Sequence, residues 1–160
     1  MSAAVRPLTA ADGPWVRAWT AADFGDETAV SRGKLYHPDQ LSGFVAEQSG
    51  QPVGLLTYRL DGDECEVVSL HSHARRQGVG TLLIRAVVEF ARQAGLRRVW
   101  LITTNDNTPA QRFYESGHFR LAAVHKGALA ESRRLKPAIP LTGIDGVPIE
   151  DELEYEFILR

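Results

Sequence analysis

The sequence predicts a single mixed α/β domain, and three observations support this prediction. Apolar residues recur with helical period across residues 79–94, and Gly95 follows at the position of a helix C-cap. Shorter strand-like runs, bounded by turn residues such as Asp61-Gly62, precede and follow that helix. The chain has 160 residues, the length of one ordinary domain, and it contains no internal repeat or linker. We therefore expect one domain that spans residues 1–160.

The elements before the long helix follow from local patterns. Thr9 or Asp12 can cap a helix in which Trp15 and Trp19 recur at helical spacing. Residues 24–40 hold glycine and proline among polar residues, which predicts a loop with a short helix. Period-2 patterns predict strands over residues 4–8, 44–47, 53–60 and 64–70.

The elements after the long helix are predicted in the same way. Residues 108–115 form a helix with Pro109 in its first turn, where proline is tolerated. The proline-rich stretch 126–150 is either a functional loop or contains a short helix near residues 129–135. Strands are expected over residues 97–103, 119–124 and 152–159, and the last of these alternates Glu with apolar residues, as a strand with one wet face does.

Composition and charge exclude several classes of function. The formal net charge is −2, so the basic excess typical of nucleic-acid or anionic-membrane binders is missing, and we expect no nucleic acid and no membrane partner. Of the 18 basic residues, all but Lys34, Lys126 and Lys136 are Arg, whose planar side chain suits phosphate. No apolar run is long enough to span a bilayer, and the N-terminus has no signal-peptide core. We therefore expect a cytoplasmic protein.

Cysteine and histidine content argue against redox and metal chemistry. Cys65 is the only cysteine, so an internal disulfide or a multi-cysteine metal site is excluded. Its apolar strand predicts a small buried residue and not a nucleophile. His37, His118 and His125 form no ligand spacing with carboxylate pairs, so no metal is predicted.

A phosphate-binding element is predicted where the strand that ends near Leu70 leads into the long helix. Gly78 and Gly80 expose backbone N–H groups at the start of that helix, where phosphate binds readily. A plain tight turn that needs glycine is the alternative. A P-loop would need a Lys after Gly80, and a dinucleotide fingerprint would need Gly or Ala in place of Leu83.

The motif Arg75-x-x-Gly78-x-Gly80, after a strand that ends in Val68-Ser69-Leu70, resembles the acyl-CoA pyrophosphate motif of the GNAT superfamily of N-acetyltransferases. Residues 101–115 resemble the next strand and helix of that family, with Asn107 and Tyr114 at matching positions. The resemblance covers residues 64–124. One departure is that the glycine before Phe119 stands one place early, with His118 between.

The resemblance implies a GNAT-like α/β (α+β) fold, which is a central mixed, mostly antiparallel twisted sheet with helices on both faces. The strands at 64–70 and 97–103 should be parallel and splay apart to admit acyl-CoA. It implies an acyl-CoA-dependent N-acetyltransferase that moves the acetyl group of acetyl-CoA, a co-substrate, to a primary amine of a small molecule or peptide by direct attack. A CoA-binding sensor or interaction domain without acceptor chemistry is the alternative, and the length of the acyl chain stays open.

The resemblance also implies which residues bind the cofactor. Main-chain groups around Leu70 would pair with the pantetheine, as an added strand does. The N–H groups of residues 76–81 would hold the pyrophosphate. The expected cofactor-binding residues are Leu70, Arg75, Arg76, Gln77, Gly78, Val79, Gly80, Thr81, Asn107 and Phe113. Asn107 can equally be a helix cap, and the two roles are compatible.

Tyr114 is the expected general acid, because a phenol with a pKa of about 10 is protonated at neutral pH and can donate to a leaving thiolate. The alternative is an aromatic packing residue. Glu66 and Glu64 are the candidate bases, since related enzymes often place a Glu on this strand, and solvated carboxylates are the alternative. His71 and His73 lie at the end of this strand, near the expected phosphate-binding element, and polar loop residues are the preferred interpretation of both.

Acceptor specificity is expected on the segments 24–38 and 126–150, which vary among such enzymes. Cations on both segments suggest an acceptor with a carboxylate or phosphate, unless they are only solvated loop residues. The residues concerned are Arg32 and Lys34, with Tyr36 beside them, and Arg133, Arg134 and Lys136. Many relatives dimerise, so a homodimer is left open.

Overall fold

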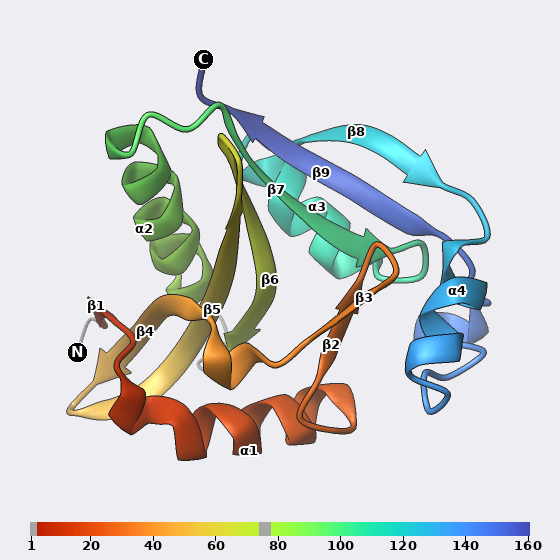
Figure 1. Cartoon of the computed structure of the whole chain (residues 1–160), viewed down its shortest axis with the longest axis horizontal. Coiled ribbons are helices and arrows are strands. Elements are labelled where there is room, and N and C mark those ends of the chain that lie inside the picture. Colours follow the sequence, from red (N-terminus) through yellow and green to blue (C-terminus); the bar gives the residue numbers. More distant parts are fainter. Residues whose placement is uncertain (1–2, 74–77) are drawn as a thin grey trace.

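The computed structural model describes residues 3–73 and 78–160, which fold around one seven-stranded sheet (Figure 1). The strand order is β1-β4-β5-β6-β7-β9-β8, and all neighbours are antiparallel except β6 and β7. The strands are β1 (Ala4–Pro7), β4 (Ser42–Gln48), β5 (Gln51–Asp61), β6 (Glu64–Ser72), β7 (Arg98–Thr104), β8 (Arg120–His125) and β9 (Glu152–Ile158). The mixed, mostly antiparallel sheet expected from the sequence is thus confirmed.

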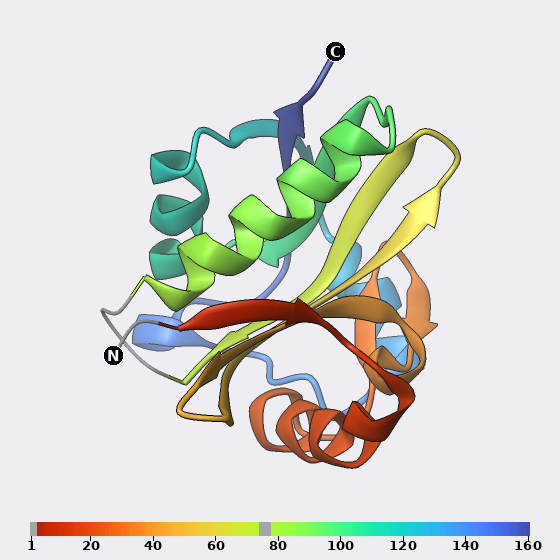
Figure 2. The same ribbon diagram turned by 90° about the vertical axis from the view of Figure 1, so that its left-hand side faces the viewer.

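Helices cover both faces of this sheet, as expected. The helices α2 (Val79–Gln93) and α3 (Thr108–Ser116) lie on one face, and α1 (Gly13–Phe24) and α4 (Ala128–Leu135) lie on the other (Figure 2). Gly95 has a φ of 74°, which confirms the left-handed cap after α2. In the part of the chain that the structure describes, no helix is long and apolar enough to cross a membrane.

The segment that follows α1 differs from the expected loop with a short helix. It forms a small hairpin of β2 (Ala29–Ser31) and β3 (Lys34–Tyr36), followed by a single helical turn at Pro38–Gln40. Arg32 and Gly33 make the turn, and both have positive φ, as a two-residue hairpin loop requires. Strands of three residues are too short to show a period, so the pattern did not predict the hairpin.

The two parallel strands separate along their length. They pair only from Glu64–Arg98 to Val67–Leu101, which leaves the end of β6 and the end of β7 without each other as neighbours. The expected parallel pairing and splay are therefore confirmed. The gap lies at the centre of the sheet, between the helices of the two faces.

A β-bulge at Val68 changes the face of the sheet to which the following side chains of β6 point. The partner strand β5 pairs with Val67 and then with Ser69, so Val68 is the extra residue. Leu70 consequently packs with Val67 against the core under α2, whereas Glu66 lies on the opposite face. Regular alternation along a strand would place Leu70 on the same face as Glu66, and this expectation is wrong because the bulge shifts the alternation by one residue.

The main core lies between the sheet and α2. Its buried residues include Leu83 and Val87 from α2, and Leu101 from β7. Cys65 is fully buried in this core, and burial raises the pKa of its thiol to about 12. The interpretation of Cys65 as a small core residue is confirmed.

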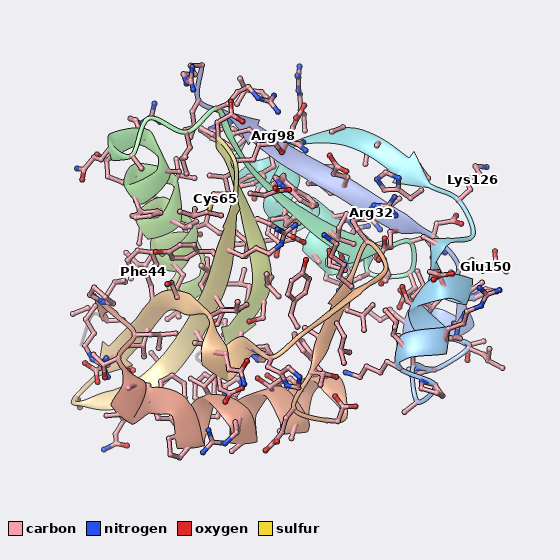
Figure 3. The ribbon with its side chains drawn as sticks, in the orientation of Figure 1. Arg32, Phe44, Cys65, Arg98, Lys126 and Glu150 are labelled. Carbon is pink, nitrogen blue, oxygen red and sulfur yellow. The ribbon has the colours of Figure 1, made fainter. Side chains whose placement is uncertain are left out.

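The glutamates of β9 do not form a wet face. Glu152 and Glu156 are buried, and arginines cover this face of the sheet. Arg98 Nη1 donates to Glu154 at 2.8 Å and to Glu156 at 2.9 Å, and Arg32 Nη1 donates to Glu152 at 2.9 Å (Figure 3). The alternation predicted the strand correctly, but the polar face is filled by ion pairs and not by water.

Candidate active site

A groove of about 400 Å³ opens where β6 ends and α2 begins, with α3 as its second wall. Most of the residues that were expected to bind the cofactor meet here. The groove is lined by Leu70, Ser72, Gly78, Val79, Gly80, Thr81, Ala110, Phe113 and Tyr114. Three further expected residues, Arg75, Arg76 and Gln77, lie outside the described residues.

The start of α2 provides a site for an anion. Gly78 has a φ of 71° and forms the N-cap without a side chain. The first intrahelical bond is that of Leu82 N–H to the Gly78 carbonyl at 3.0 Å. The N–H groups of Val79, Gly80 and Thr81 precede that bond, so they are the donors that a helix leaves for phosphate. These donors fit the pyrophosphate expected from the sequence.

Gly80 also determines how closely α2 approaches α3. A Cβ at this position would lie 3.1 Å from the Cζ of Phe113, which is tighter than ordinary van der Waals contact. A larger residue would require the Phe113 ring to shift by a few tenths of an ångström. Glycine at this position therefore allows the close approach of α2 and α3.

Tyr114 lies half-buried on α3, among other aromatic rings. Its ring centroid is 5.2 Å from that of Phe113, 5.8 Å from that of Phe119 and 6.3 Å from that of Tyr155. Burial raises the pKa of the Tyr114 phenol above its usual value, so the proton stays on the oxygen at neutral pH. The same residue lines the groove, which places a protonated donor at its wall.

Asn107 acts as a helix cap, one of the two roles expected for it. Its side-chain oxygen accepts a hydrogen bond from the backbone N–H of Ala110 at 3.2 Å, at the first turn of α3. Asn107 does not line the groove, so its cofactor role stays a prediction.

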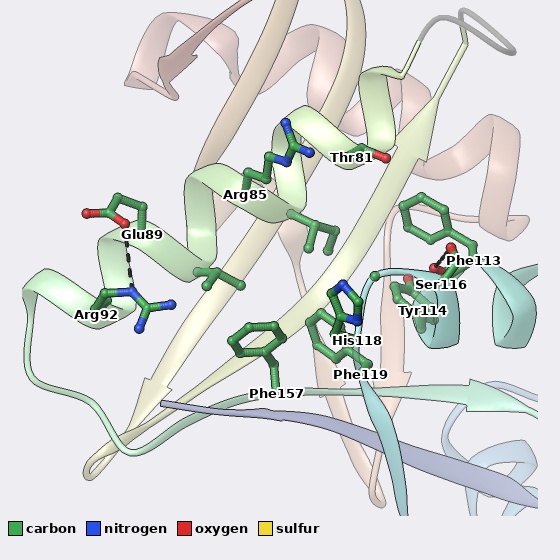
Figure 4. A pocket seen from close by; sticks show the side chains of 13 residues that line it. Thr81, Arg85, Glu89, Arg92, Phe113, Tyr114, Ser116, His118, Phe119 and Phe157 are labelled. Atoms are coloured by element: carbon green, nitrogen blue, oxygen red, sulfur yellow. Dashed lines mark hydrogen bonds and ion pairs between the residues drawn. The ribbon is translucent and has the colours of Figure 1, made fainter. Parts of the chain in front are cut away.

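A second groove of about 520 Å³ adjoins the first and shares Thr81, Phe113 and Tyr114 with it. Figure 4 shows Arg85 and Arg92 on the α2 side of this groove, across from Phe157. It lies on the same face of the sheet as the first groove, because both are walled by α2 and α3.

The displaced glycine of the sequence has a visible consequence at the end of α3. Gly117 has an ordinary φ of −86°, and His118 takes the left-handed conformation with a φ of 71°. Non-glycine residues adopt that conformation at a cost. His118 borders the second groove, beside Phe119 (Figure 4).

The two candidate bases lie away from the grooves. Glu66 is 1% exposed, and its carboxylate accepts hydrogen bonds from Ser31 Oγ at 2.6 Å and from Arg59 Nε at 2.7 Å. Desolvation raises the pKa of Glu66, although both donors oppose it. Glu64 is bound by Arg97 and Arg98 at the paired end of β6. The structure therefore does not bring these carboxylates together with Tyr114.

A cavity of about 460 Å³ lies on the opposite face of the sheet. Its walls come from both segments that were expected to select the acceptor, and from the separated ends of β6 and β7. The residues that line it include Asp23, Phe24, Val30, Val68, Ile102, Thr103, Leu129, Lys136, Ile139, Pro140 and Glu152. Groove and cavity thus flank the gap between the two strands.

Most of the cations that suggested an anionic acceptor have internal partners. Lys136 Nζ donates to the Thr28 carbonyl at 2.8 Å and lies 3.1 Å from Asp26. Arg133 donates to main-chain carbonyls, including that of Ile149 at 2.7 Å. Arg134 pairs with Glu131, and Arg32 with Glu152. These residues hold the two segments in place, which weakens the prediction of a carboxylate or phosphate on the acceptor.

The sequence did not predict a cluster of Asp23, His71 and His73 at the rim of this cavity. Asp23 Oδ2 lies 2.5 Å from His71 Nδ1 and 3.1 Å from His73 Nε2. His71 is buried in β6 against the ring of Phe24, with centroids 4.9 Å apart, so it is not a polar loop residue. Burial lowers the pKa of His71 although Asp23 opposes this, and the imidazole is neutral at pH 7. No local pattern links an Asp at a helix end to a strand 48 residues later.

The same three side chains also have metal-ligand spacing. Their ligand atoms lie within 4.8 Å of one another. The expectation of no metal was based on His37, His118 and His125, and it did not consider this trio.

Comparison with known proteins agrees with this geometry. Residues 8–119 match the sequence model of the acetyltransferase (GNAT) family. The chain belongs to the GNAT acetyltransferase family. It is therefore an enzyme of the N-acetyltransferase type, as the resemblance implied.

Relatives of this GNAT enzyme include two uncharacterized proteins of Bacillus subtilis. YdhI is 41% identical over 83% of this chain and 83% of its own length, and YxbD is 36% identical over 86% and 87%. The fold is similar to that of a GNAT family acetyltransferase from Elizabethkingia anophelis with acetyl-CoA bound. That structure gives a TM-score of 0.73 at 15% identity and covers 99% of both chains. The GNAT-like fold is confirmed.

Proposed function

We propose that this GNAT enzyme transfers the acetyl group of acetyl-CoA directly to a primary amine of a small molecule or a peptide. The observation that carries the proposal is the gap between β6 and β7. A groove walled by the start of α2 opens on one face of the sheet beside this gap, and a separate cavity opens on the other. Two substrates can therefore approach each other from opposite sides.

The groove suits the co-substrate. The N–H groups at the start of α2 would hold the pyrophosphate, and the main chain around Leu70 would pair with the pantetheine. The bound thioester supplies the acetyl group. Tyr114 stands at the wall of the same groove, where its hydroxyl can donate to the sulfur.

The proposed reaction balances in protons and electrons. The lone pair of the neutral amine forms the N–C bond with the carbonyl carbon, and the C–S bond breaks with its electrons on sulfur. The thiolate takes the proton of the Tyr114 hydroxyl. The amine nitrogen loses its proton to solvent, and solvent returns a proton to the phenolate of Tyr114. The products are an amide and free CoA thiol.

The test measures the two halves of the reaction separately. Calorimetry measures the binding of acetyl-CoA, which the groove is proposed to hold. Release of free thiol with a panel of primary amines measures the transfer of the acetyl group. We expect stoichiometric binding and amine-dependent thiol release. No detectable binding of CoA at millimolar concentration would exclude the proposal. Binding without thiol release across amino acids, aminoglycosides, polyamines and peptide N-termini would instead indicate a CoA-binding sensor.

A further inference from the structure

We propose that the cavity on the acceptor face binds a cationic amine with an apolar body, and that the carboxylate of Asp23 anchors the cation before the nitrogen loses a proton to solvent and attacks as the neutral amine. This inference rests on the proposed function and names the class of its acceptor. It is carried by the distribution of charge around the cavity and by the surroundings of Asp23.

Three ionisable residues line the cavity, and two of them are already neutralised by a neighbour. Glu152 is paired with Arg32, with 2.9 Å between Oε1 and Nη1. Lys136 is paired with Asp26, with 3.1 Å between Nζ and Oδ1. Asp23 is the third, and its partners among the described residues are the two histidines. Within residues 3–73 and 78–160, the wall of the cavity therefore carries one negative charge that no lysine or arginine balances.

The position of Asp23 adds to this negative potential. It lies in the last turn of α1, near the negative end of the helix dipole, where a basic residue would be favourable and none occurs. Desolvation raises the pKa of Asp23, but the hydrogen bonds from His71 and His73 outweigh it and the net shift is downward. The carboxylate is thus ionised at neutral pH at a place where a cation is favoured.

The histidines hold the carboxylate in place. Both imidazoles contact the same oxygen, Oδ2, and among the described residues Oδ1 has no hydrogen-bond partner. His71 is buried and stacked on Phe24, and the His73 ring lies 3.8 Å from that of Trp19. Asp23 itself has 36% of its side chain exposed, and it lines the cavity. A fixed and accessible oxygen is what recognition of an ammonium group requires.

The rest of the cavity wall is mainly apolar. It is formed by Phe24, Val30, Val68, Ile102, Leu129, Ile139 and Pro140. Its volume of about 460 Å³ falls in the range of small-molecule pockets. A carboxylate next to the amine would face Asp23, and a polyamine would leave the apolar wall unfilled. The fitting acceptor is therefore a small monoamine whose body is hydrophobic.

The experiment uses probes that share one body and differ in charge. N,N-dimethyl-2-phenylethylamine is a cation that cannot form a stable amide, and 2-phenylethanol is its neutral counterpart. Their binding to the full-length enzyme with CoA present is measured by calorimetry. The variants are Asp23→Asn and, as a matched loss of one carboxylate, Glu27→Gln on the exposed turn that follows α1. Turnover of 2-phenylethylamine and of phenylalanine is compared in parallel.

We expect the wild type and Glu27→Gln to bind the cation about tenfold tighter than the alcohol, a difference that corresponds to about 1.4 kcal/mol. Asp23→Asn should abolish that preference, and kcat/KM should be about tenfold higher for 2-phenylethylamine than for phenylalanine. The inference is overturned if the cation fails to bind, if both probes bind equally to the wild type, or if Asp23→Asn keeps the preference. Loss of acetyl-CoA binding, measured separately, would instead count against the proposed function.

Discussion

Arg59 and Glu66 form an ion pair beneath the β2–β3 hairpin, with 2.7 Å between Nε and Oε1. Ser31 of the hairpin donates to the other carboxylate oxygen at 2.6 Å. Both oxygens of Glu66 are therefore engaged, and the side chain is almost fully buried. A carboxylate in this state has no free oxygen to offer to an amine.

Glu66→Gln should consequently affect stability more than catalysis. Removing the charge leaves Arg59 without its buried partner, and we expect the free energy of unfolding to fall by about 3 kcal/mol. We expect kcat/KM of the folded variant to fall less than about tenfold. Denaturant unfolding and thiol release measure the two effects. The control is Glu64→Gln, whose carboxylate is more exposed than that of Glu66, so we expect a smaller loss of unfolding free energy. A loss of about 100-fold in kcat for folded Glu66→Gln would make Glu66 the base.

Tyr114→Phe tests the proposed acid. The variant keeps the ring that packs on Phe119 but removes the proton donor, so we expect kcat to fall by about 100-fold or more with the Kd of acetyl-CoA nearly unchanged. Steady-state kinetics and calorimetry separate the two quantities. Tyr58→Phe, which packs against the core and lines neither groove, is the matched control and should keep full turnover. A rise in Kd with turnover per bound complex preserved would show that Tyr114 only seats the cofactor.

His118→Gly should stabilise the protein. His118 has a φ of 71°, which costs a non-glycine residue roughly 1–2 kcal/mol, while glycine adds entropy to the unfolded chain. The net gain in unfolding free energy should be about 0.5–1 kcal/mol in denaturant titrations. His118→Ala removes the ring but keeps the strained conformation, so it should give no gain. Equal stability of the two variants would show that the left-handed backbone conformation at position 118 is not strained.

His71 predicts a pH dependence of stability near neutrality. Its pKa is lowered by burial, so the unfolded chain binds a proton that the folded protein rejects as the pH falls below about 6.5. Stability should therefore decrease from about pH 6.5 downward, until the lowered pKa is passed, with a slope of at most about 1.4 kcal/mol per pH unit. The pKa of Asp23 is lowered, so its own contribution to the pH dependence of stability appears only at lower pH, below the usual pKa of an aspartate.

His71→Gln should remove this part of the pH dependence in unfolding titrations between pH 5 and 7.5. The exposed His37→Gln should leave it unchanged. An unaltered slope in His71→Gln would mean that another group is responsible.

The elements that the sequence predicted well are those whose signals are local. The helix α2 follows from its apolar period and the glycine after it, and the cap at Asn107 from its position before Pro109. The elements that it did not predict depend on contacts made elsewhere. The β2–β3 hairpin has strands of three residues, and it is held by partners such as Glu66 and Glu152 from distant strands.

The candidate site likewise has one part with local sequence signals and one part that depends on distant contacts. The groove proposed for the cofactor is built from the end of β6, the start of α2 and α3, which all lie within residues 64–116, so its glycines and Leu70 could be identified by spacing. The acceptor cavity combines the end of α1, two loops and the ends of two strands, and its charge depends on which cations are paired. Arg133 is an example, because its charge is known from the sequence but the main-chain carbonyl groups to which its guanidinium donates are known only from the structure.

In the proposed function, the extra residue at Val68 would let one strand serve two substrates. Leu70 turns towards the face that holds the groove proposed for the thioester, and His71 turns towards the face that holds the cavity proposed for the acceptor. Neighbouring side chains can then change independently, because a substitution on one face leaves the other untouched. Acceptor choice could thus diverge among descendants of such an enzyme while the machinery for the common donor stays constant, whereas a one-residue deletion here would exchange the two faces and disrupt both at once.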